Sequence, residues 1–202
     1  MLRSLYLLPA VVIVLLGNAP GTPKKLGTRP PAESPPNPEL HRAWEQFAHA
    51  VRANDLPALR HLSAACIQCT DCVTNTAAEE TAFENYKDQH PDTWYDELYG
   101  SFSFIPAEAF WRKDGPLIFD TKTKLRLLNR AKLRFAANDH NKAGYVAPCL
   151  ILPAQAALAH VDEVLLTYLE PYPSGRGEGM QKAFAFVRTK QGYKFCGYST
   201  IP

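Results

Sequence analysis

Residues 181–199 read QKAFAFVRTKQGYKFCGYS, and this stretch decides the fold class of the chain. Side chains alternate with a period of two on both sides of Gly192, which predicts a β-hairpin. A turn at Gln191-Gly192 would place Val187 opposite Cys196 and Ala185 opposite Tyr198. The other face then carries Phe184, Phe186 and Phe195. Because both faces are largely apolar, we expect the hairpin to be central, covered on both sides or lining a cavity.

Other short strand patterns precede the hairpin, and helical patterns precede the strands. We expect strands around residues 132–135, 145–152 and 163–169, where β-branched and aromatic residues gather. Helices in the first half and strands in the second predict an α+β fold with an antiparallel sheet.

The helical half begins with a clear start signal. Asn37 is a predicted N-cap, with a proline at the first helical position. One apolar stripe then follows at helical spacing: Leu40, Trp44, Phe47 and Val51.

Several further helices are predicted after this one. Asn54-Asp55 should end the first helix and cap a second, whose buried side holds Leu56, Leu59 and Leu62. Thr76 to Glu79 matches a capping box, so a third helix should run to about Gln89. One or two turns are expected within 91–99 and a short helix within 105–111, whereas 122–130 is ambiguous between helix and strand.

The N-terminus resembles a secretory signal, residues 1–19. Arg3 precedes the apolar run Leu5–Leu16, which is shorter than the ~20 residues that span a bilayer. Small residues at 17 and 19 predict cleavage after Ala19, although an uncleaved N-terminal anchor is the alternative. We therefore expect a secreted or periplasmic protein with no stable membrane span after cleavage.

A linker and one domain follow the signal. Residues 20–37 are rich in proline and nearly lack apolar side chains, so we expect a disordered linker. Residues 38–202 form the predicted α+β domain. The net charge of +2 is too small to suggest a nucleic-acid partner.

Five cysteines occur, at 66, 69, 72, 149 and 196. In an oxidising compartment, Cys69 and Cys72 are expected to form a structural disulfide, and Cys149 with Cys196 is a weaker pair. Cys66 is then the expected unpaired thiol. A thiol redox motif and a zinc site with His61 are the alternatives, and both fit export and this sequence context less well.

The order of these elements resembles uncharacterised exported bacterial proteins that are similar to the NTF2-like superfamily of α+β cones. The resemblance is carried by the Trp44/Phe47 helix, the segment Ile67–Cys72, the segment Ile105–Phe110 and the closing hairpin. It implies helices packed on a strongly bent antiparallel sheet, with a pocket between them. Members include isomerases and dehydratases as well as binding proteins, so the resemblance does not fix a function.

Candidate catalytic and binding residues are few. His160, Asp162 and Tyr168 are the candidate acid/base residues, because a histidine and an aspartate two positions apart on a strand share a face. Tyr168, Tyr193 and Tyr198 are candidate pocket residues, and Arg176 and Glu178 lie in a long Gly/Pro-rich loop that could form a binding rim.

The sequence favours a non-catalytic domain that binds a small molecule or a protein. It contains no nucleophile elbow, phosphate loop or zinc-protease motif, and no cofactor or metal is expected. The alternatives are a small-molecule enzyme (isomerase, dehydratase or hydrolase) acting in the pocket, or a thiol redox module. Whether the protein forms a homodimer is left open.

Overall fold

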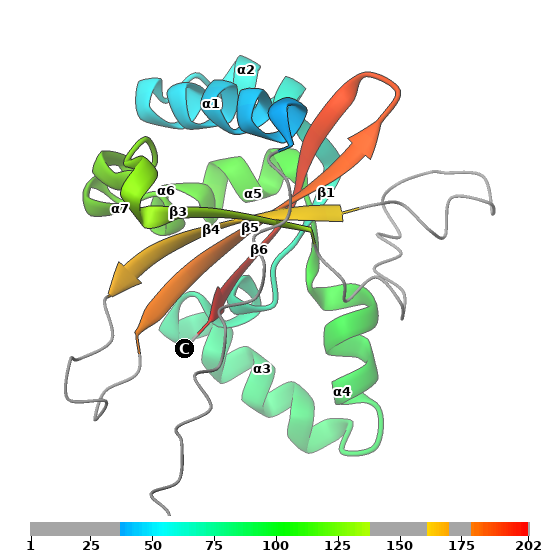
Figure 1. Cartoon of the computed structure of the whole chain (residues 1–202). Coiled ribbons are helices and arrows are strands. Elements are labelled where there is room, and N and C mark those ends of the chain that lie inside the picture. The colour runs from blue at the N-terminus through cyan, green and yellow to red at the C-terminus, as the bar shows by residue number, and fades with distance from the viewer. Residues whose placement is uncertain (1–36, 138–160, 170–178, 202) are drawn as a thin grey trace, which may run out of the picture. The chain divides into compact units, whose positions relative to one another are not determined.

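The computed structural model describes residues 37–137, 161–169 and 179–201 (Figure 1). All of them lie within the unit of residues 33–202. Within these ranges, no helix is both long enough and apolar enough to cross a membrane.

The core of the fold is a six-stranded mixed sheet that does not close. The strand order is β2-β1-β6-β5-β4-β3, and every neighbouring pair is antiparallel except β1 and β6. The strands are β1 (Ser63–Gln68), β2 (Phe104–Pro106), β3 (Leu133–Ala137), β4 (Val161–Leu169), β5 (Met180–Thr189) and β6 (Gly192–Ile201).

The helices α1, α2, α5 and α6 contribute side chains to the core on one face of this sheet, whereas α3 and α4 lie on the other side from α1 (Figure 1). The α-helices are α1 (Pro38–Ala53), α2 (Leu56–Leu62), α3 (Ala77–Gln89), α4 (Trp94–Glu97), α5 (Ala107–Lys113), α6 (Gly115–Ile118) and α7 (Thr121–Arg126). Short 3-10 helices, η1 (Asp71–Thr74) and η3 (Arg130–Lys132), and a π-helical turn, η2 (Leu98–Phe102), complete the described elements. The prediction of an α+β fold is confirmed.

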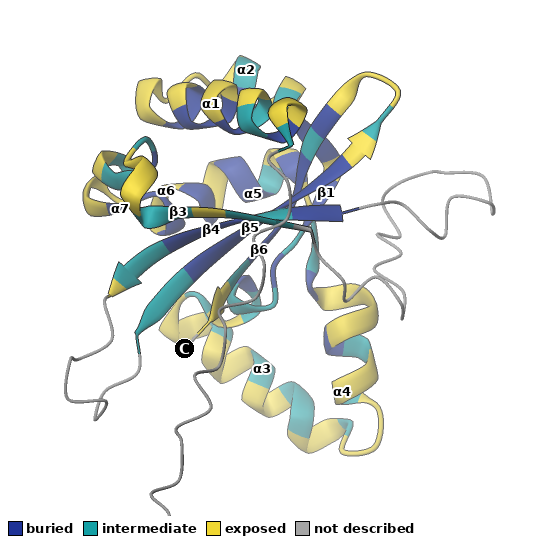
Figure 2. Cartoon of the chain, viewed as in Figure 1, coloured by how far each residue is buried: buried dark blue, intermediate teal, exposed yellow. Residues whose placement is uncertain are grey.

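Helix α1 packs on the sheet through the apolar stripe that its sequence predicts. The Asn37 side chain caps it by accepting from the backbone N–H of Glu39 and Leu40, and Asn54 ends it in the left-handed conformation. Its predicted stripe is buried, and Phe47 lies 4.8 Å from Phe195 and 5.4 Å from Phe186, ring centre to ring centre. Aromatic side chains thus fill the space between helix and sheet. Figure 2 shows α1 as alternately buried and exposed, and the middle of the central strands as buried.

The next two helices follow their predicted caps. Asp55 caps α2 and Thr76 caps α3, and α3 ends at Gln89, one residue before its C-cap His90. The buried side of α2 is narrower than expected, because Leu56 is exposed. The ambiguous segment 122–130 begins within α7, whose N-cap is Asp120.

Strand β1 was not expected, and its parallel pairing with β6 makes the sheet mixed rather than antiparallel. Its sequence, SAACIQ, holds one β-branched residue and no aromatic residue, so its local preference for a strand is weak. Burial between β2 and β6 stabilises it instead.

The closing hairpin is confirmed, but its register differs from the prediction. The turn is Lys190-Gln191, so Thr189 pairs with Gly192 and Val187 with Lys194. Gly192 has a positive φ of 99°, which glycine tolerates. An irregularity between Ala185 and Phe186 shifts the pairing again, placing Ala185 opposite Gly197. The three phenylalanines nevertheless share the helix-covered face, and β5 and β6 are central.

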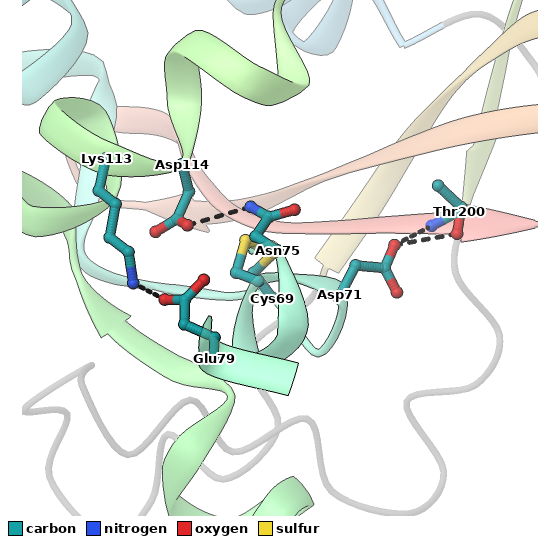
Figure 3. The surroundings of a disulfide bond; sticks show 8 residues. Cys69, Asp71, Asn75, Glu79, Lys113, Asp114 and Thr200 are labelled. Carbon is teal, nitrogen blue, oxygen red and sulfur yellow. Dashed lines mark hydrogen bonds and ion pairs between the residues drawn. A yellow bond between two sulfur atoms is a disulfide. The ribbon is translucent and has the colours of Figure 1, made fainter. Parts of the chain in front are cut away.

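The Cys69–Cys72 disulfide is present, with a Cα–Cα distance of 5.3 Å. Figure 3 shows how its turn is fastened: Asp71 accepts from the backbone and hydroxyl of Thr200, and Asn75 donates to Asp114 at 3.0 Å. The motif follows strand β1 rather than a helix, yet both cysteines are buried. This burial supports a structural role over a redox role.

The other cysteines correct the prediction. Cys66 is disulfide-bonded, so it is not the unpaired thiol. Cys196 is free and buried in the face opposite the helices, so the expected Cys149–Cys196 pair is not formed. Cys149 lies outside the described residues.

Replacing Phe47→Ala should lower the free energy of unfolding by about 3–5 kcal/mol, because the cavity would lie at the centre of the aromatic layer. Urea unfolding followed by circular dichroism measures this. The exposed Leu125→Ala is the matched control and should change stability by less than about 0.5 kcal/mol. Equal effects of both variants would contradict the assigned core.

Thiol labelling should separate the cysteines. Burial raises the pKa of the Cys196 thiol to about 12, so it should react with iodoacetamide only after unfolding. Cys69 and Cys72 should remain unlabelled even after unfolding unless a reductant is added. Peptide mass spectrometry identifies each site, and full labelling of Cys69 and Cys72 in the native protein would contradict the disulfide.

Candidate functional site

An open cleft of about 640 Å³ lies between α1, the end of α2 and the β5–β6 hairpin. Arg42, Ala43 and Gln46 of helix α1 line the cleft, and their spacing of three and four residues places them on one side of the helix. The apolar stripe of the same helix points the other way, into the core. The remaining lining residues are Glu39, His61, Leu62, Arg188, Thr189, Lys190, Gln191, Gly192, Tyr193 and Lys194.

The cleft is strongly positive. Its lining holds four side chains that are cationic at neutral pH, namely Arg42, Arg188, Lys190 and Lys194, and one carboxylate, Glu39. The Glu39 carboxylate pairs with the Arg188 guanidinium at 2.8 Å, and both side chains remain about half exposed.

The other cations differ in how firmly they are held. The Lys194 ammonium donates to the backbone oxygen of His61 at 2.5 Å, which joins the hairpin to the end of α2. Arg42 and Lys190 are both exposed at opposite walls of the cleft. They are therefore available to contact a ligand from two sides.

A buried hydrogen-bond network fixes the sheet side of the cleft. The Tyr193 hydroxyl donates to the carboxylate of Asp162, which is 3% exposed. The Asn37 amide donates to the Tyr193 oxygen at 2.8 Å and to Asp162 at 3.3 Å. Asn37 thus caps α1 and joins it to β4 and β6 at once.

The network changes the acidity of Tyr193. Burial, together with the hydrogen bond to the Asp162 carboxylate, raises the pKa of Tyr193 to about 12. At neutral pH its hydroxyl is therefore a fixed hydrogen-bond donor to Asp162.

The structure does not bring Asp162 and Tyr168, two of the three candidate acid/base residues, together. Asp162 and Tyr168 lie six positions apart on β4, roughly 20 Å along an extended strand. Asp162 is enclosed by Tyr193 and Asn37, and His160 lies outside the described residues.

Tyr168 lies instead in a cluster of cations near α7. The ammonium groups of Lys122 and Lys182 lie 4.5 and 4.7 Å from the centre of its ring. Lys182 is buried and donates to the Ile118 carbonyl and the Thr123 hydroxyl, both at 2.8 Å. Burial lowers the pKa of Lys182, while its hydrogen bonds fasten α6 and α7 to β5.

Of the other predicted pocket residues, one lines the cleft, one is buried in the core and two lie in an undescribed segment. Tyr193 lines the cleft, whereas Tyr198 is buried beside Phe184, with ring centres 5.7 Å apart, and burial raises its pKa. Arg176 and Glu178 lie outside the described residues.

The zinc alternative fails on its ligands, because Cys69 and Cys72 are oxidised and His61 lines the cleft. Across the ranges given above, no three His, Cys, Asp or Glu side chains are grouped as metal ligands. Comparison of the chain with protein-family models, curated proteins and solved structures finds no match.

The sequence does not predict the cationic lining of the cleft. Its members come from α1, the end of α2 and the hairpin turn, and none forms a run of basic residues. A usable signal was present only in the hairpin, where Arg188, Lys190 and Lys194 follow one another closely.

Removing the Tyr193 hydroxyl should destabilise the fold. In Tyr193→Phe, the buried Asp162 carboxylate loses a donor, which should cost about 1–3 kcal/mol at neutral pH. Thermal unfolding measures the loss, and the exposed Tyr95→Phe serves as the control. An equal melting temperature for wild type and Tyr193→Phe would contradict the network.

The same network predicts a pH dependence. Because the folded-state pKa of Tyr193 lies above the ordinary value of 10.0, its stabilising contribution is complete below pH 10. It should be lost as the pH rises from 10 to about 12. In Asp162→Asn the pKa of Tyr193 should fall towards its ordinary value. Ultraviolet titration of tyrosinate measures this, and the Tyr193→Phe protein identifies the part of the signal that comes from Tyr193. An unchanged titration would exclude the Asp162 contact as a cause.

Proposed function

We propose that this protein is a non-catalytic binding domain whose cleft holds an anionic ligand. The observation that carries the proposal is the lining of four cationic side chains against one carboxylate. Two arginines and two lysines favour carboxylate, phosphate or sulfate groups, because guanidinium and ammonium donate charge-assisted hydrogen bonds to them.

The arrangement supports binding over catalysis. Asp162, the nearest buried carboxylate, is already hydrogen-bonded to Tyr193 and Asn37, and neither it nor Glu39 is placed as an unpaired base. The cleft is also open, so it does not exclude water from a reacting centre.

Export and an NTF2-like cone remain part of the proposal. A Cys69–Cys72 disulfide is consistent with folding in an oxidising compartment. Helices on one face of a six-stranded sheet are consistent with the resemblance. Where the resemblance implies a pocket, aromatic side chains fill the space, so we place the ligand at the rim.

Calorimetric titration with citrate and with inorganic phosphate tests the cleft. We expect the tricarboxylate to bind more tightly, and its affinity to fall with added salt. The double variant Arg42→Gln/Lys190→Gln should weaken citrate binding by about tenfold, equivalent to about 1.4 kcal/mol. Neither residue is packed in the core, so folding should be unaffected.

The double variant Arg52→Gln/Arg112→Gln is the matched control, because it removes the same number of charges and both arginines are exposed and do not line the cleft. It should bind citrate as the wild type does. Loss of binding in this control equal to that of Arg42→Gln/Lys190→Gln would show a nonspecific charge effect. Absence of citrate and phosphate binding would contradict the proposal.

A further inference from the structure

A second, apolar groove of about 400 Å³ lies along α3, on elements separate from the cationic cleft. Helix α3 has no buried residue along its length, and Figure 2 shows α3 and α4 as largely exposed. One stripe of α3 faces the groove: Glu79, Ala82, Phe83 and Tyr86. The spacing of these residues is that of a single helix side, so α3 presents an incompletely covered apolar face.

The opposite wall of the groove is formed by the fold itself. Phe102, Ile105 and Ala109 come from η2, β2 and α5, and Val73 follows the disulfide turn. Because Cys72 is tied to Cys69, this end of the groove is held in place. The groove is therefore a preformed apolar slot rather than a gap between loops.

Three polar residues of the lining, Glu79, Lys113 and Asp114, lie near the disulfide (Figure 3). Glu79 and Lys113 form an ion pair there, and the buried Asp114 accepts from Asn75 at 3.0 Å. The rest of the lining is aliphatic or aromatic, apart from the Tyr86 hydroxyl, which donates to Glu97.

Aromatic side chains continue beyond the groove. Tyr95, Tyr99 and Phe102 are three of the eight large hydrophobic side chains exposed in the described part of the chain. Phe83 of the groove packs on Trp94 at 6.1 Å, and Trp94 packs on Tyr95 at 5.6 Å, so the groove and this surface are continuous.

The surroundings of the groove are strongly acidic. Residues 76–103 carry seven carboxylates and one lysine, whereas the whole chain has a net charge of +2. Glu80, Glu84 and Asp88 recur every fourth residue along α3, a spacing at which like charges destabilise a helix, and Lys87 pairs with Glu84 at 2.6 Å. A cationic partner would relieve this repulsion.

We infer that the α3 groove binds a cationic peptide segment, with an apolar side chain of the peptide in the slot and its lysine or arginine side chains against the acidic surface. The apolar lining suits an apolar side chain of the peptide, and the excess of carboxylates favours positively charged peptides over negatively charged ones. The partner chemistry is thus opposite to that of the cleft.

Fluorescence anisotropy with labelled peptides tests this inference on the full chain. The probe has two leucines flanked on each side by two lysines. One comparison peptide replaces the leucines by serine, and another replaces the lysines by glutamate. We expect the leucine–lysine peptide to bind at least tenfold more tightly than either.

Variants on the same helix locate the binding site. Ala82→Trp fills the groove and should weaken binding at least fivefold. Thr81→Trp places the same side chain outside the groove and should change binding less than twofold. Circular dichroism should show equal helix content in both variants.

Equal affinity for the serine peptide would show that charge alone binds, and it would overturn the inference. So would absence of binding to the leucine–lysine peptide, or equal binding by Ala82→Trp and wild type. Binding of neutral phosphatidylcholine vesicles without binding of the peptide would assign the groove to a lipid and would likewise overturn it.

Discussion

The burial of the aromatic stripe of α1 against the sheet is the constraint on which the other features depend. Trp44 and Phe47 leave water by packing on Phe184, Phe186 and Phe195 of the sheet, which fixes the rotation of the helix. The polar side of α1, with Arg42 and Gln46, must then face outward beside the hairpin. The cationic cleft is therefore a direct consequence of how the core is packed, and not a separate feature added to the surface.

A buried carboxylate completes this arrangement. Asp162 would be costly to bury alone, so it requires the donors that Tyr193 and Asn37 supply. Since Asn37 also caps α1, the same contact sets where the helix starts relative to the hairpin. The network therefore stabilises the geometry of the cleft, and this accounts for a candidate catalytic aspartate that is enclosed instead of open to a substrate.

Local signals predicted much of the fold. The caps at Asn37, Asp55 and Thr76 act on the backbone of their own helices, so the starts of these helices could be recognised from sequence. The register of the hairpin could not, because it depends on the turn at Lys190-Gln191 and on an irregularity in mid-strand. Strand β1 was missed because its pairing with β2 and β6 stabilises it, while its own residues have little strand preference.

The sequence by itself determined the α+β class, the apolar stripe of α1 and the disulfide between Cys69 and Cys72. It also gave three candidate pocket tyrosines, of which Tyr193 lines the cleft. These are matters of spacing along the chain. Only the tertiary structure decided that Cys196 stays free, that Asp162 is enclosed, and that cations of α1 and of the hairpin gather at one cleft. The physical reason is that charge and packing act through space, so a net charge of +2 conceals the positive cleft until the chain is folded.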